Sequence, residues 1–217
     1  REPVPMALRV AAARLPASLP RLRGLRPSSG PAAPEPLTAA DLRAWRDAGL
    51  LDPSLGWLRS IALDLRLRAI GRFDLEGFLR GSRGAYLAVQ RLMYERRFDD
   101  LAPLVSPAVL QAVRTTMDEL AEQQLRIPAG DALEDSVVVR EASLCDAHLL
   151  EADPEVAEAH EGRLVQLHVR FVADESWAVR DEASGEETPR AHVQRSTMAF
   201  RGGLDPGGEA WRIVDIY

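Results

Sequence analysis

Histidine and cysteine give this sequence little scope for metal or nucleophile chemistry. No His lies at ligand spacing from another His or from a Cys; the four are His148, His160, His168 and His192. The single cysteine, Cys145, excludes an internal disulfide, and its place in an expected strand favours a buried thiol. Gly81-Ser82-Arg83-Gly84 falls between expected helices rather than after a strand, which argues against a nucleophile turn. We therefore expect no metal and no cofactor.

Arginine supplies the other candidate chemistry, which is the binding of phosphate groups. All 27 basic residues are Arg, and because Lys and Asn are both absent, a GC-rich coding sequence explains much of this abundance. The leader, residues 1–36, is more specific: it carries six Arg against Glu2 and Glu35, and residues 3–34 contain no acid. Its many prolines exclude a long helix. The predicted rRNA-contacting residues are Arg9, Arg14, Arg21, Arg23 and Arg26.

Two other interpretations of the leader stay open. An Arg-rich, acid-poor composition is typical of organelle transit peptides. An ordinary disordered tail is as well supported by the sequence as an RNA contact is.

The whole chain has the composition of a soluble globular protein. It has 217 residues, of which 46% are hydrophobic and 28% charged, with a formal net charge of −6. No stretch of about 18 apolar residues lacks a charge, so no membrane span is predicted. Residues 131–190 hold five Arg against 16 acids. A solvated surface is the simplest interpretation of this acidic segment, and attraction of basic presequences is the alternative.

Two helices are expected at the front of the folded part. Thr38 and Asp41 form a capping-box pattern that starts the first helix, which ends near Gly49. A second helix spans residues 53–70 and carries an apolar stripe at helical spacing: Leu55, Leu58, Ile61, Ala62, Leu65 and Ala69. Packing of this stripe against the domain is the simpler expectation, and a membrane-surface role is the alternative. The predicted membrane- or partner-facing residues are Trp45, Trp57, Arg59 and Arg66.

The remainder predicts helices followed by strands. Helices are expected over 75–80, 82–96 (after a break at Gly81) and 107–125, the last capped by Ser106. Alternating apolar residues predict strands at 137–148, 164–173, 193–201 and 211–216. The predicted fold class is α+β: helices on one face of a curved antiparallel sheet of about four strands, a cystatin-like or NTF-two-like cone, with an extended N-terminal tail.

Such a cone encloses a pocket that could hold an acid and a base. Asp146 and His168 are the residues that could serve in this way, but catalysis is the weakest of the hypotheses, because fold alone does not argue function. We expect no enzyme activity, no catalytic residues and no small-molecule substrate.

Four segments, taken in order, resemble the Tim44-like domain family. Phe73–Tyr86 resembles the opening of that domain, and Asp100–Pro107 resembles its Leu-x-x-Leu-x-Ser-Pro entry to the next helix. Val169–Val172 with Val179–Asp181 resembles its central hairpin, and Phe200–Arg201 with Trp211–Ile216 its closing hairpin. The resemblance covers residues 72–217. It implies three parts: a basic extension (1–36), front helices (37–71) and a Tim44-like α+β domain (72–217).

This resemblance implies a protein-binding role in the mitochondrial matrix, associated with the inner membrane. The import-motor anchor that names the family has a long Lys/Glu-rich segment before the domain, and bacterial relatives tend to have a membrane span; neither is expected here. We therefore expect a structural component of the large mitochondrial ribosomal subunit, near the polypeptide exit, with rRNA and neighbouring ribosomal proteins as partners. The alternative is a factor for protein import or respiratory-complex assembly.

Overall fold

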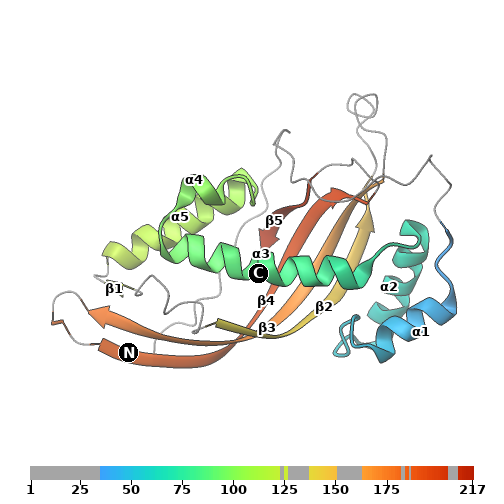
Figure 1. Cartoon of the computed structure of the whole chain (residues 1–217), viewed down its shortest axis with the longest axis horizontal. Coiled ribbons are helices and arrows are strands. Elements are labelled where there is room, and N and C mark those ends of the chain that lie inside the picture. The colour runs from blue at the N-terminus through green and yellow to red at the C-terminus, as the bar shows by residue number, and fades with distance from the viewer. Residues whose placement is uncertain are drawn as a thin grey trace.

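The computed structural model describes residues 35–122, 125–126, 137–150, 163–181, 184–185, 187–204 and 210–217. The rRNA-contacting arginines predicted in the leader lie outside these residues. Helices come first and the long strands follow (Figure 1). The elements are α1 (Ala39–Asp47), α2 (Trp57–Ile70), α3 (Leu75–Tyr94), α4 (Phe98–Leu101), α5 (Pro107–Glu122), β1 (Leu125–Arg126), β2 (Val137–Leu149), β3 (Leu164–Asp181), β4 (Glu187–Gly203) and β5 (Arg212–Ile216).

Side-chain caps set the starts of three helices. The capping box of α1 is complete: the Asp41 amide donates to Thr38 Oγ1 at 3.2 Å, and the Thr38 amide donates to the Asp41 carboxylate at 2.9 Å. Asp74 caps α3 by accepting from the amide three residues on at 2.8 Å. Ser106 does the same for α5 at 3.3 Å, with Pro107 as the first helical residue. These starts are where the sequence predicted them.

The sheet is antiparallel and is ordered β2-β3-β4-β5, with the short β1 pairing the far end of β3 on the same side as β2. Side chains alternate between its two faces. Along β3 the inward set is fully buried: Val165, Leu167, Val169, Phe171 and Ala173. Helix α3 crosses this face, while α4 and α5 lie at one end and α1 and α2 lie at the other, beside β2 (Figure 1). The predicted α+β class with helices on one face of a curved sheet is confirmed.

Two differences from the sequence prediction bear on the core. Helix α3 runs unbroken from Leu75 to Tyr94, because Gly81 lies in open space and costs the helix only backbone entropy. Strand β3 continues beyond its predicted end at residue 173, past the acidic pair Asp174–Glu175, and β4 begins at Glu187 rather than at residue 193. The Glu175 carboxylate is buried and accepts from Tyr86 Oη at 3.0 Å, and this bond lets an acidic residue continue the inward face.

Candidate functional site

Helix α2 has two apolar faces, and only one of them packs on the domain. The inner face, Leu63, Leu67 and Ile70, is at most 2% exposed. The other face, here called the outer stripe, points to solvent; its residues and exposed fractions are Trp57 72%, Leu58 64%, Ile61 50% and Leu65 62%. The expectation that Leu58, Ile61 and Leu65 pack against the domain is therefore wrong. Four large apolar side chains on one exposed helix face indicate a binding surface.

Contacts with β2 and with the residue just before β3 hold α2 in this orientation. Arg66 forms an ion pair with Asp146 of β2, and Arg163 donates to the carbonyl of Ile70 at the end of α2. Just before α2, Leu51 makes a parallel bridge with Leu144 on the edge of β2. These contacts anchor α2 to the sheet, so the outer stripe faces away from the domain.

A buried ion pair secures the turn between α1 and α2. The buried Asp52 carboxylate accepts from Arg170 Nη1 at 3.1 Å and from the Ser54 amide at 2.8 Å. Burial acts to raise the pKa of Asp52, but these hydrogen bonds outweigh it and hold the pKa below its ordinary value. Asp52 therefore stays ionised and fixes the turn that leads into α2.

Positive charge accompanies the outer stripe. Arg59 and Arg68 are exposed and take part in no ion pair within the described residues. The one acid of α2, Asp64, is neutralised by Arg46 of α1. The apolar stripe is therefore accompanied by exposed arginines, a combination suited to an anionic, partly apolar surface.

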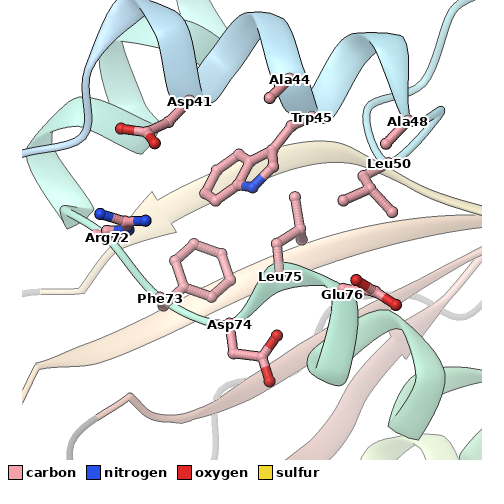
Figure 2. Close-up of a pocket in the computed structure, with 10 residues that line it drawn as sticks. All are labelled: Asp41, Ala44, Trp45, Ala48, Leu50, Arg72, Phe73, Asp74, Leu75 and Glu76. Carbon is pink, nitrogen blue, oxygen red and sulfur yellow. The ribbon is translucent and has the colours of Figure 1, made fainter.

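A second surface lies beside α1, between that helix and the start of α3. This front groove has a volume of about 520 Å³. Figure 2 shows Trp45, Leu50, Phe73 and Leu75 pointing toward one another to form its apolar floor. The rings of Trp45 and Phe73 meet edge to face at 5.6 Å. Trp45 is half-buried here, whereas Trp57 is exposed on α2.

Acidic residues dominate the rim of the front groove. Asp41, Asp74 and Glu76 lie along it, with Arg72 as the one cation among the lining residues (Figure 2). Hydrogen bonds from the Thr38 side chain and backbone lower the pKa of Asp41. The two surfaces at this end of the molecule thus differ in charge: the groove is acidic and the outer stripe is basic.

The structure brings together part of the predicted set of partner-facing residues. Trp57, Arg59 and Arg66 all lie on α2, although Arg66 is tied to Asp146 rather than free. Trp45 faces the front groove instead. The groove was missed by sequence reasoning, because α1 and residues 72–76 show no shared pattern; only the Phe73-Asp74 motif marked one side of it.

The two candidates for acid/base chemistry lie on the sheet face opposite the core. His168 alternates with the buried Leu167 and Val169, and its partner across the strands is Asp146. Asp146 is paired with Arg66, and His168 Nδ1 lies 2.6 Å from Tyr217 Oη. Burial lowers the pKa of His168. Both side chains have structural partners on this outer face of the sheet, so they do not supply the acid and base that the pocket hypothesis considered.

Side chains fill the part of the cone that the structure describes. Tyr86 stacks on Phe171 with ring centroids 4.8 Å apart. Burial of the Tyr86 hydroxyl, and secondarily the charge of the nearby Glu175, raises the pKa of Tyr86. Burial likewise raises the pKa of the Cys145 thiol to about 12, in keeping with an unreactive cysteine. Among the described residues, no cluster of three or more His, Cys, Asp or Glu is arranged to hold a metal ion.

Comparisons with known proteins show which protein family this chain belongs to. Within the described residues, no helix combines the length and the apolar character needed to cross a membrane. Comparison with curated protein sequences finds no significant match. Among solved structures, the intermembrane space region of the chloroplast protein ARC6 is similar, with 13% identity and a TM-score of 0.41 over 67% of this chain and 96% of that one. The family model of the Tim44-like domain matches residues 67–216, and the chain therefore belongs to the Tim44-like domain family.

Proposed function

We propose that this chain is a non-enzymatic attachment protein in the mitochondrial matrix that joins the large ribosomal subunit to the inner membrane near the polypeptide exit. The exposed outer stripe on α2, with its neighbouring arginines, is the observation that carries this proposal. Membership in the Tim44-like family supports a membrane-associated role in protein interaction.

The outer stripe suits a membrane surface better than a water-facing position. Helix α2 has 14 residues and is therefore about 21 Å long. It would lie in the plane of the interface, with Trp57, Ile61 and Leu65 among the acyl chains and Arg59 and Arg68 at anionic headgroups. Half or more of each stripe side chain is exposed, so inserting each one would contribute about 1–2 kcal/mol.

Contacts of this size give reversible binding. The four side chains together would supply about 4–8 kcal/mol before any ordering cost, which is comparable to a single lipid anchor and insufficient for stable attachment. A second contact is needed. The leader would provide it, with Arg9, Arg14, Arg21, Arg23 and Arg26 on rRNA phosphates and neighbouring ribosomal proteins around the domain.

A role in import or respiratory-complex assembly is the second candidate. The acidic segment 131–190, with five Arg against 16 acids, favours it because basic presequences would be attracted there. In that case the same outer stripe would hold the domain at the membrane while it binds other polypeptides.

The membrane contact is tested by flotation of the full chain with vesicles that contain anionic phospholipid. Leu58→Gln/Leu65→Gln removes apolar area from the outer stripe, and Leu87→Gln is the matched control, since Leu87 is an exposed helical leucine on α3. We expect the double variant to bind about 30-fold more weakly, from about 1 kcal/mol per leucine, and the control to bind like the wild type. Equal binding by the double variant would refute the membrane contact.

The ribosomal contact is tested by sedimentation of solubilised mitochondria at low and high salt. Co-migration with the large subunit, weakened when the five leader arginines are changed together to Gln, is the expected result. Migration with a membrane complex or near the top of the gradient would favour the import or assembly role instead.

A further inference from the structure

The front groove is an apolar surface with a negative rim, and the function proposed above does not use it. Its floor consists of the half-buried Trp45, Leu50 and Phe73 and the buried Leu75, and its volume of about 520 Å³ is enough to receive several side chains. Its occupant should therefore combine apolar side chains with positive charge.

Two of the rim carboxylates take part in helix caps. The Asp41 carboxylate accepts from the Thr38 amide at 2.9 Å and from Thr38 Oγ1 at 2.7 Å, and the Asp74 carboxylate accepts from the amide three residues on at 2.8 Å. Glu76 is exposed on the first turn of α3, where it pairs with Arg80 on the same helix. The cation on the rim, Arg72, is paired with Glu35 at 3.3 Å. The groove thus keeps an excess of negative charge.

This chain contains a segment of the required chemistry at the required place. Residues 3–34 have no acid and combine five Arg with Leu, Ala, Val and Pro. The described chain begins at Glu35, whose carbonyl accepts from the Arg72 amide at 3.0 Å, beside the groove that Arg72 lines. Arg26 is nine residues before Glu35 and Arg23 is twelve, and nine residues can reach up to about 30 Å.

We propose that the leader, residues 3–34, docks back into the front groove of its own chain, with arginines on the rim carboxylates and apolar side chains on the floor. The outer stripe is the other exposed apolar surface at this end, but Arg59 and Arg68 beside it would repel a basic segment. The short tether gives an effective concentration of about 1 mM, so even a weak contact would be substantially occupied.

Docking of this kind would regulate the leader. The arginines held on the groove are the ones available to a polyanion, so RNA and the groove compete for them, and release is favoured by RNA or by high salt. This contact does not depend on the function proposed above, because it is a property of the isolated chain.

Limited trypsin digestion of the full chain tests the proposal, with cleavage after Arg21 and Arg23 followed by mass spectrometry. A synthetic peptide of residues 1–34 gives the rate for an undocked leader. The variant Asp41→Asn/Asp74→Asn/Glu76→Gln removes the rim charge. Thr38 remains as the N-cap of α1, and Asn is a good N-cap residue in place of Asp74 on α3. The matched control, Asp99→Asn/Glu119→Gln/Glu122→Gln, removes three exposed charges on α4 and α5 at the opposite end of the molecule (Figure 1).

We expect the leader of the wild type and of the control to be cut about five- to sixfold more slowly than the peptide. This factor corresponds to a dissociation constant of about 0.2 mM for the groove and an effective leader concentration of about 1 mM. The rim variant should be cut nearly as fast as the peptide. Cleavage of the wild type at the rate of the peptide, or equal protection in the rim variant, would overturn the proposal. Protection that rises with protein concentration would also overturn it, because a second copy would then supply the leader.

Discussion

The two faces of α2 should differ strongly in how much stability the same substitution costs. Leu67→Ala and Leu65→Ala delete the same atoms from one helix two residues apart, so helix propensity changes equally and cancels in the comparison. Leu67 is fully buried on the inner face, whereas Leu65 is 62% exposed on the outer stripe. Burial alone therefore sets the difference in the free energy of unfolding.

The magnitude follows from that burial. Replacing a fully buried leucine by alanine costs about 3–4 kcal/mol from lost transfer energy and the remaining cavity. For a domain of this size that lowers the melting temperature by about 6–16 °C. Leu65→Ala should change the free energy of unfolding by less than about 0.5 kcal/mol.

Urea unfolding followed by circular dichroism, with a thermal scan as a second probe, measures both variants. The flotation assay on the same two proteins should give the reverse order, with Leu65→Ala the weaker membrane binder. A Leu65→Ala variant as destabilised as Leu67→Ala would refute the assignment of inner and outer faces, and with it the outer stripe.

Three further substitutions test other parts of the structure. Gly81→Ala should raise the free energy of unfolding in urea titration by about 0.5–1 kcal/mol, because Gly81 lies inside α3 with open space around it. Gly202→Ala should instead lower it by about 1–3 kcal/mol, because the added Cβ would meet the Trp211 ring at 2.6 Å; an unchanged value would mean that the ring moves aside freely. Arg170→Met should destabilise the fold by about 1–3 kcal/mol at pH 7 by removing a partner of the buried Asp52 carboxylate. The pKa of Asp52 is depressed in the fold, so its charge contributes stability above pH about 4 that is lost as the pH falls through the folded-state pKa, and unfolding curves of wild type and Arg170→Met should converge in acid.

Local signals in the sequence predicted the features that neighbouring residues decide. Thr38, Asp74 and Ser106 cap helices through atoms within three residues, and each start was predicted. The strand from Val165 to Ala173 was predicted in the same way, because every second side chain on it is apolar and buried. Such features are determined by residues close together in the sequence and do not depend on which distant element packs against them.

Features decided by distant residues could not be predicted in this way. Periodicity cannot choose between the two apolar faces of α2; the choice is made by Asp146 and Leu144, which lie on β2 far along the chain. Glu175 interrupts the apolar pattern of β3, and its buried carboxylate accepts from Tyr86, which lies 89 residues away in the sequence. The front groove combines two segments whose residues share no spacing, so it became visible only in three dimensions.

The attachment of α2 to β2 also constrains the order in which the chain can become structured during synthesis. Arg66 and Asp146 are 80 residues apart in sequence, so at about 5–20 residues per second the helix is complete several seconds before its docking strand exists. During that interval Leu63, Leu67 and Ile70 are as uncovered as the outer stripe, and a helix apolar on both sides is prone to aggregate. A nascent chain of this protein would therefore need a chaperone or the shelter of a membrane surface at its front end until the sheet has formed.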